Sequence, residues 1–179
     1  MPKPKSRPQE ELAHIKASWT MSDDGILVWA RDAGRGKKAG DAVGVTTLKS
    51  GSQNCYLRFD GKLKGYSVGQ VAWFLYHGEW PSLEIDHVNC QPDNHRLENL
   101  RLATRQEQCF NRAAGRKGRA NKGVYRTPTG KWVAQMWVDG KAFWLGTHLT
   151  EEDAAQARIV AASKTQGAFA NTKSYEVQL

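Results

Sequence analysis

One stretch of the sequence, residues 84–112, reads EIDHVNCQPDNHRLENLRLATRQEQCFNR. It is dense in side chains that bind metals or transfer protons, namely Asp86, His87, Asn89, Asp93, Asn94, His95, Glu98, Asn99 and Gln108. Hard divalent cations prefer oxygen ligands, and an imidazole can take a proton from water near neutral pH. The stretch therefore meets the chemical requirements of metal-assisted phosphodiester hydrolysis.

Two other interpretations of this stretch stay open. In the first, Asn and Asp side chains only cap a loop and a helix, and His87 and His95 are ordinary polar residues. In the second, His87, Cys90, His95 and Cys109 bind a structural Zn²⁺. Structural zinc sites usually pair cysteines two to four residues apart, and this chain has no such pair. The ordered set favours the nuclease; we then expect His95 at the surface or on a phosphate, and Cys109 buried in a helix.

The order and spacing of these residues resemble the HNH endonucleases, specifically the phage and intron-borne homing type. The resemblance is carried by Ile85-Asp86-His87, Asn94, Leu97-Glu98-Asn99-Leu100-Arg101, Ala103-Thr104, Glu107 and Asn111-Arg112, with residues 75–81 as the lead-in. It implies a ββα-metal core, in which a β-hairpin and a helix hold one divalent ion. By this resemblance, His87 is the general base, Asn99 fixes the loop and orients the histidine, and Asp86 is a metal ligand.

The third position of the family signature departs from the usual pattern. The homing subgroup has His or Asn nine residues after the middle Asn, and this chain has Gln108 there. Glutamine offers the same carbonyl oxygen on a stem one methylene longer, so it either binds a displaced metal or fails to bind one. The expected ion is Mg²⁺, with Mn²⁺ as the alternative, held by Asp86 and Gln108.

The resulting interpretation is a metal-dependent, site-directed DNA endonuclease. One metal site per monomer most simply gives a nick, and a double-strand break needs a dimer or two binding events. The competing interpretation is a non-catalytic DNA-binding protein whose nuclease site has decayed at Gln108.

Residues 121–172 predict a second module of three strands and a helix. Turns are expected at residues 127–130 and at Asp139-Gly140, and Thr150 is expected to cap the helix. Strand alternation sorts the side chains of the second and third strands. The set expected to face the helix is Trp132, Ala134, Met136, Val138, Phe143 and Leu145. The set expected to face outward is Lys131, Val133, Gln135, Trp137, Ala142 and Trp144, with Tyr125 or Arg126 nearby.

This module resembles the APETALA-type, or ethylene-response-factor, DNA-binding domain. The resemblance is carried by Lys122-Gly123-Val124-Tyr125, residues 130–135, Trp144-Leu145-Gly146-Thr147, residues 150–155 and Gly167-Ala168-Phe169-Ala170. It implies that the sheet enters the major groove and that Lys131, Gln135, Trp137 and Trp144 face DNA. Arginines common in that family are missing at Trp137 and Ala142, so no target sequence is transferred. A protein-binding face is the alternative, and RNA binding ranks third because a closely spaced aromatic pair is missing.

Charge supports an anionic partner. The 179 residues carry 26 Lys and Arg against 18 Asp and Glu, a net charge of +8. Residues 111–122, NRAAGRKGRANK, contain no acidic side chain and form either a backbone-tracking connector or a solubilising linker. The predicted contacts with double-stranded DNA are Arg112, Arg116, Lys117, Arg119, Lys122, Tyr125, Arg126, Lys131, Gln135, Trp137 and Trp144.

The predicted fold class is α+β, with a ββα-metal core preceded by short strands and a small three-stranded sheet packed on one helix. The predicted order is a disordered leader (1–12), a nuclease domain (13–114), a basic linker (115–120), a DNA-binding domain (121–172) and a tail (173–179). Asp60-Gly61 indicates a hairpin, and a helix is expected from Ser67 to Tyr76. No apolar run is long enough for a membrane span. We expect a cytoplasmic protein, in the host cell if phage-encoded, acting as a monomer or a transient dimer on DNA.

Overall fold

The computed structural model describes residues 6–111, 122–138 and 140–170, so the predicted linker 115–120 lies outside the described residues. The chain divides into two compact units, Met1–Arg105 and Gln106–Leu179. Both mix helices with small antiparallel sheets, which confirms the predicted α+β class. Within the described ranges, no helix has the length and apolar composition needed to span a membrane.

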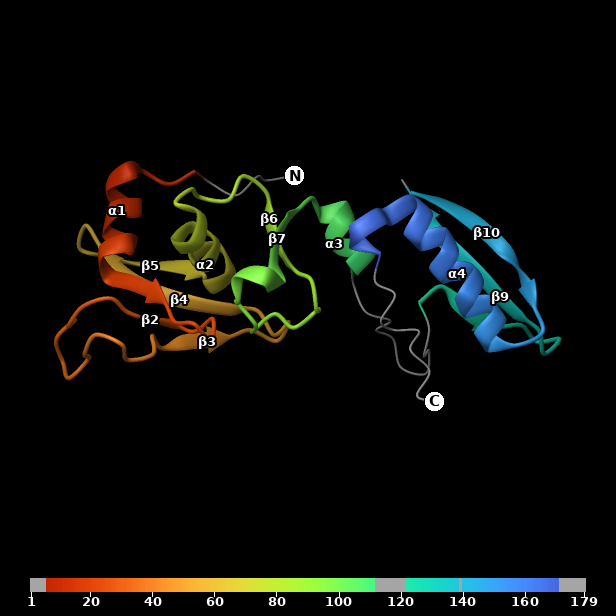
Figure 1. Ribbon diagram of the computed structural model, residues 1–179, viewed down its shortest axis with the longest axis horizontal. Coiled ribbons are helices and arrows are strands. Elements are labelled where there is room, and N and C mark those ends of the chain that lie inside the picture. Colours follow the sequence, from red (N-terminus) through yellow and green to blue (C-terminus); the bar gives the residue numbers. More distant parts are fainter. Residues whose placement is uncertain (1–5, 112–121, 139, 171–179) are drawn as a thin grey trace. The chain divides into compact units, whose positions relative to one another are not determined.

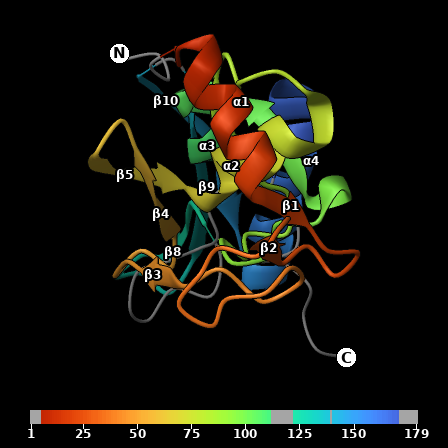
Figure 2. The same ribbon diagram turned by 90° about the vertical axis from the view of Figure 1, so that its left-hand side faces the viewer.

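Over its described residues, 6–105, the first unit contains three small antiparallel sheets and two α-helices (Figure 1). Its elements are α1 (Gln9–Ser18), β1 (Trp19–Met21), β2 (Leu27–Trp29), β3 (Val45–Thr47), β4 (Gln53–Phe59), β5 (Lys62–Ser67), α2 (Val68–His77), β6 (Glu84–His87), η1 (Leu97–Asn99) and β7 (Leu100–Ala103). The sheets are β1–β2, β3–β4–β5 and β6–β7. Helices α1 and α2 both contact β4 (Figure 2).

The turn between β4 and β5 has the backbone that its sequence predicts. Phe59 pairs with Lys62, and the two residues between them, Asp60 and Gly61, have positive φ angles of 51° and 70°. Positive φ at both central positions is typical of the two-residue hairpin turns that fit strand twist. The next predicted boundary is also right, because α2 begins directly after Ser67, although the Ser67 side chain makes no capping hydrogen bond.

Aromatic side chains dominate the core of this unit. Trp19 is fully buried, and its ring meets those of Trp29 and Tyr66 edge to face. The remaining core residues are Ile15, Leu27, Val43, Cys55, Leu57, Val68, Val71 and Phe74. Because α2 contributes three of these, it is fixed against the sheet, and it also contacts β6, the strand that carries Asp86 and His87.

The predicted disordered leader is wrong over its last four residues, because α1 begins at Gln9. Glu11, on the first turn, is only 2% exposed. Its carboxylate accepts hydrogen bonds from Lys64 Nζ at 2.6 Å, Tyr66 Oη at 2.9 Å and Arg7 Nη1 at 3.1 Å. Two of these partners, Lys64 and Tyr66, lie on β5, far along the chain. Glu11 is therefore a buried polar anchor, although the charges around it in the sequence are typical of a solvated segment.

Replacing Glu11 by Ala is expected to lower the free energy of unfolding by about 2 kcal/mol, because the buried Tyr66 hydroxyl loses its acceptor. Urea denaturation at pH 7 measures this. The exposed neighbour provides the control, since Glu10→Ala removes the same kind of charge from the same helical turn and should change stability by less than about 0.5 kcal/mol. Equal losses of stability in Glu11→Ala and Glu10→Ala would contradict the role of Glu11 as a buried anchor.

The same anchor predicts a pH dependence. Burial alone raises the pKa of a carboxyl group, but hydrogen bonds from Lys64 and Tyr66, with the charge of Arg7, outweigh it and hold the pKa of Glu11 below 4.5. A depressed folded-state pKa gives stability that is present above the unfolded-state pKa and is lost as the pH falls through the folded-state value. The stability gap between wild type and Glu11→Ala should therefore narrow below pH 4.5.

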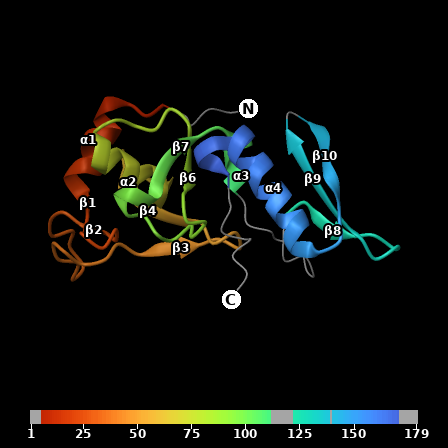
Figure 3. The same ribbon diagram turned by 45° about the vertical axis from the view of Figure 1, so that its right-hand side comes forward.

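The second unit is the predicted three-stranded sheet with one long helix. Its elements are α3 (Arg105–Asn111, which begins at the unit boundary), β8 (Val124–Arg126), β9 (Trp132–Val138), β10 (Lys141–His148), α4 (Glu151–Gln166) and η2 (Gly167–Phe169). The strand order is β10–β9–β8, and α4 packs on this sheet (Figure 3). Thr150 Oγ1 accepts a hydrogen bond from the Asp153 amide at 3.1 Å, so the predicted N-cap is confirmed.

Small side chains allow α4 to approach the sheet closely. Ala154 and Ala155 of α4 pack against Val124 and Ala134 of the sheet. Gly123, just before β8, has a φ of 76°, and a Cβ there would lie 2.3 Å from the Gln135 carbonyl oxygen. A larger residue at this position therefore cannot be accommodated without separating β8 from β9.

Exposure departs from strict alternation at two positions of this sheet. Val133, expected to face outward, is only 7% exposed, whereas Phe143, expected to face inward, is 48% exposed. Val133 lies on the central strand, with Tyr125 and Thr147 paired on either side of it. Phe143 lies on the edge strand β10, just before the register shift between Trp144 and Gly146. The strands on both sides cover Val133 at the centre of the sheet, whereas Phe143 at the edge has a neighbouring strand on one side only and stays exposed.

Candidate functional site

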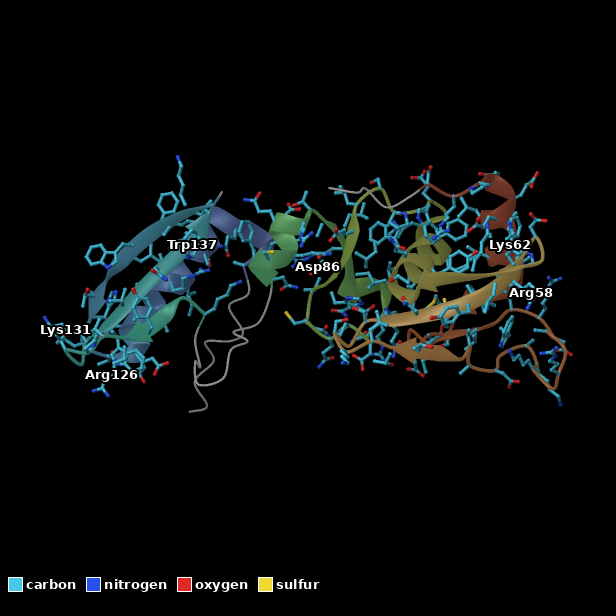
Figure 4. The ribbon with its side chains drawn as sticks, turned by 180° about the vertical axis from the view of Figure 1, so that it is seen from behind. Arg58, Lys62, Asp86, Arg126, Lys131 and Trp137 are labelled. Atoms are coloured by element: carbon cyan, nitrogen blue, oxygen red, sulfur yellow. The ribbon has the colours of Figure 1, made fainter. Side chains whose placement is uncertain are left out.

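Asp86 and His87 are the last two residues of β6, which pairs with β7. Adjacent strand residues point to opposite faces, and the two side chains have different partners accordingly. Asp86, which is labelled in Figure 4, is buried. Its Oδ2 accepts a hydrogen bond at 2.8 Å from Nε of Arg101, the residue paired with it on β7, and forms an ion pair at 2.8 Å with Nη2 of the same side chain. The Arg101 side chain therefore holds the Asp86 carboxylate in a fixed position.

The ring of His87 lies against the ring of His95. His87 Nε2 is 3.2 Å from His95 Nδ1, within hydrogen-bonding distance. Burial lowers the pKa of His87, and the carboxylates of Asp86 and Asp93 partly oppose this shift. His87 is therefore predominantly neutral at pH 7, which is the state in which an imidazole can accept a proton.

His95 is only 4% exposed, so its predicted place at the surface was wrong. Its Nε2 is 3.2 Å from Gln53 Oε1, on β4. Burial and, to a smaller extent, His87 lower the pKa of His95 to about 4. Sequence reasoning missed this residue because the loop that carries it has no periodicity from which an inward direction can be read.

Asn99 holds the two ends of the loop between β6 and β7. It is 6% exposed; its Oδ1 accepts a hydrogen bond from the Asn89 amide at 3.0 Å, and its Nδ2 donates to the Asn94 carbonyl at 2.7 Å. Its own carbonyl accepts from the Val88 amide at 2.9 Å. These bonds match the loop-fixing role implied for this residue, because they span the segment that contains His95.

The outer side of this loop is fixed by two glycines elsewhere in the unit. A Cβ at Gly51 would lie 2.7 Å from Pro92 Cγ, and a Cβ at Gly25 would lie 2.7 Å from the Arg96 amide nitrogen. Both glycines have positive φ, and each sits in a turn between strands. The loop therefore packs closely on the β1–β2 and β3–β4 connections, and its side chains are held in place.

The second predicted metal ligand, Gln108, belongs to the other compact unit. Gln108 is on α3 within Gln106–Leu179, whereas Asp86 belongs to Met1–Arg105, and the ligand role of Gln108 stays a prediction. Its neighbour Cys109 is exposed rather than buried as predicted. Over residues 6–111, 122–138 and 140–170, no three His, Cys, Asp or Glu side chains gather in a way that could hold a metal.

The exposed face of the second sheet carries the predicted aromatic groups. Trp137 and Trp144 are 60% and 70% exposed. Trp144 pairs with Gln135, and residues opposite one another in a sheet share a face, as do Gln135 and Trp137 two positions apart. Figure 4 shows Lys131, which directly precedes β9, and Trp137, near the end of that strand.

The other predicted DNA contacts divide into three groups. Tyr125 pairs with Val133 and so shares the face of Gln135, whereas Arg126 pairs with Trp132 and starts from the opposite face. Lys122 Nζ donates to the carbonyls of Cys109 and Phe110, at 2.6 Å and 3.3 Å. The other four, Arg112 and the linker residues Arg116, Lys117 and Arg119, lie outside the described part of the chain.

Comparison with known proteins identifies both modules. Residues 66–109 match the family model of the HNH endonuclease, and residues 120–168 match that of the AP2 domain. The chain contains an HNH endonuclease domain followed by an AP2 domain. The HNH match includes β6, β7 and α3 up to Cys109, and thus Asp86, His87, Asn99 and Gln108. Both families predicted from the sequence, and the class of enzyme, an HNH endonuclease, are confirmed.

Two known proteins show similarity beyond these models. The chain is 28% identical over 181 residues to an uncharacterised HNH endonuclease of Acanthamoeba polyphaga mimivirus, and the alignment covers 94% of this chain and 95% of the viral protein. A solved structure that describes DNA binding and cleavage by the HNH homing endonuclease I-HmuI is similar with a TM-score of 0.44 and 20% identity. That similarity covers 62% of this chain and 57% of the other.

Proposed function

We propose that this protein is a metal-dependent, site-directed DNA endonuclease in which the AP2 domain positions the HNH domain on double-stranded DNA. The observation that carries the proposal is the arrangement of the HNH signature, with Asp86 and His87 at the end of β6 and Asn99 bracing the loop that follows. The net charge of +8 and the exposed Trp137 and Trp144 support a DNA partner.

In the proposed mechanism, His87 takes a proton from a water molecule as that water attacks the phosphorus. A new P–O bond forms to the water oxygen, the ester bond to the leaving sugar oxygen breaks, and that oxygen takes up a proton from solvent. Burial supports this role for His87 by keeping its imidazole neutral and ready to accept the proton. Asn99 keeps the adjacent loop in place, and one such site per chain gives a nick.

The donor set fits a hard cation. Magnesium is commonly held by one or two carboxylates together with substrate phosphate oxygens, and Asp86 supplies a buried carboxylate that Arg101 holds in place. Asp86 and Gln108 would hold the ion, which would supply electrostatic stabilisation of the charge that develops on the phosphate. Mn²⁺ has the same ligand preference and is the alternative metal.

Supercoiled-plasmid cleavage tests the proposal. With Mg²⁺, wild type is expected to convert supercoiled plasmid to the open-circular form, and EDTA should abolish this conversion. The Gln108→Asn variant restores the residue usual in the homing subgroup and shows whether the longer side chain limits the reaction. If wild type only shifts DNA in a gel and Gln108→Asn cuts it, the result would instead support the interpretation that the nuclease site has decayed.

The AP2 domain gives a separate prediction. Trp144→Ala is expected to weaken binding to double-stranded DNA about tenfold, since exposed tryptophans at interfaces commonly contribute more than 1 kcal/mol. The matched control is Phe143→Ala, which removes an exposed aromatic ring from the neighbouring position of β10 on the other face of the sheet. Fluorescence anisotropy with a duplex measures both. Equal losses, or no loss at Trp144, would count against this face as the DNA-binding surface.

A further inference from the structure

Three side chains from distant parts of the sequence, His87, His95 and Gln53, form a row in which each lies within hydrogen-bonding distance of the next. His87 Nε2 lies 3.2 Å from His95 Nδ1, and His95 Nε2 lies 3.2 Å from Gln53 Oε1. The three residues come from β6, the following loop and β4. Neither His95 nor Gln53 has a role in the proposed mechanism, yet His95 is almost fully buried, which is unusual for an imidazole without a structural or chemical purpose.

The direction of the hydrogen bonds follows from the last member of the row. An amide oxygen only accepts, so His95 Nε2 donates its proton to Gln53 Oε1. A neutral imidazole carries one N–H, so His95 Nδ1 is then an acceptor, and His87 Nε2 must donate to it. Neutral His87 therefore has its N–H at Nε2 and its basic lone pair at Nδ1.

This tautomer is the one a general base needs here. His87 Nε2 points at the buried ring of His95, so a proton from water has to be taken by Nδ1. If the Gln53 amide were turned over, its NH₂ would donate to His95, both rings would reverse, and the basic nitrogen of His87 would face the protein interior. The orientation of one amide on β4 thus selects between a working and a non-working base.

We propose that His95 and Gln53 are positioning residues that hold His87 in its Nε2–H tautomer. This inference rests on the proposed function, in which His87 is the general base. Burial supports it by lowering the pKa of His95 to about 4, which keeps that ring neutral with a single N–H. The loop that carries His95 is fixed by Asn99 on one side and by the Gly51–Pro92 contact on the other, so the row is preorganised.

The tautomer can be measured without any activity. Long-range ¹H–¹⁵N NMR spectra of ¹⁵N-histidine-labelled full-length protein distinguish a protonated ring nitrogen from a bare one, and single substitutions assign the five histidines. Wild type at neutral pH is expected to show His87 and His95 both protonated at Nε2. A His87 ring protonated at Nδ1 would overturn the proposal.

Cleavage kinetics provide the second arm. His95→Leu is expected to lower the cleavage rate at saturating DNA about 10- to 100-fold, as found for other partners that orient a functional histidine, with unchanged DNA affinity. His95→Asn places an amide oxygen where Nδ1 stood, so it should keep most of the rate, whereas His95→Gln puts its amide beyond that position and should not. Gln53→Leu should lower the rate in the same direction as His95→Leu.

These variants separate positioning from folding. Thermal melts show whether His95→Leu, His95→Gln and His95→Asn are equally folded. If His95 has a purely structural role, the cleavage rates of the variants should follow their melting temperatures and should not depend on whether the new side chain places an acceptor at the position of Nδ1. Wild-type rates in His95→Leu or in Gln53→Leu would overturn the proposal. Absence of cleavage by wild type would overturn the proposed function instead, while the NMR spectra would still decide the tautomer.

Discussion

His87→Ala is expected to lower the rate of plasmid nicking about 1000-fold while leaving DNA binding unchanged. A positioned general base contributes roughly 100- to 10,000-fold to a reaction of this kind. Its effect is on proton transfer, so the affinity for DNA, which we propose to come from the exposed face of the AP2 domain, should not change. Single-turnover nicking and a binding titration on the same duplex measure the two quantities.

The control for this variant is another histidine of the same unit. His77, at the end of α2, is exposed and stacks on Trp73 with ring centroids 3.9 Å apart. His77→Ala should nick at the wild-type rate. If wild type and His87→Ala nick equally fast, His87 is not the general base. The nicking would then come from a contaminating nuclease or from another base.

Asp86→Asn is expected to lower nicking about 100-fold or more at any Mg²⁺ concentration. Stabilisation of transition-state charge by a bound metal contributes several kcal/mol, and 100-fold in rate corresponds to about 2.7 kcal/mol. The amide keeps the shape of the carboxylate but loses the charge that would hold the ion. Rates measured over a Mg²⁺ titration should show a weaker apparent affinity for the metal together with the lower maximum.

Loss of the ion pair with Arg101 has to be separated from loss of the metal. Arg101→Gln breaks the same 2.8 Å contact and leaves the carboxylate in place. Both variants should lower the melting temperature, but only Asp86→Asn should change the metal dependence of the rate. Asp24→Asn, at an exposed ion pair with Arg96, controls for the removal of an acidic charge. Identical metal titrations for Asp86→Asn and wild type would exclude Asp86 as a ligand.

Local sequence features predicted the units of this fold well. Asp60-Gly61 indicated a two-residue hairpin, and both residues have the positive φ that such a turn requires. Thr150 indicated a helix start, and its side chain accepts the expected hydrogen bond. Features of this kind depend on residues within a few positions of one another, so the sequence contains all that is needed to find them.

The errors all concern burial that is set by distant partners. Glu11 was assigned to a disordered leader, but Lys64 and Tyr66 on β5 bring its carboxylate into the core. Phe143 was assigned to the core by alternation, but it lies on an edge strand and is half exposed. In each case the deciding neighbour is not adjacent in sequence, and no local pattern carries that information.

The same distinction between local sequence features and distant contacts applies to the candidate site. The order and spacing of Asp86, His87 and Asn99 identified the HNH endonuclease family, because a given reaction needs particular side chains at particular spacings. The sequence by itself therefore determined which chemistry the chain is equipped for. Only the tertiary structure placed Gln53 and His95 beside His87, since a hydrogen bond across 42 positions of sequence forms when the β4 strand and the loop after β6 pack together.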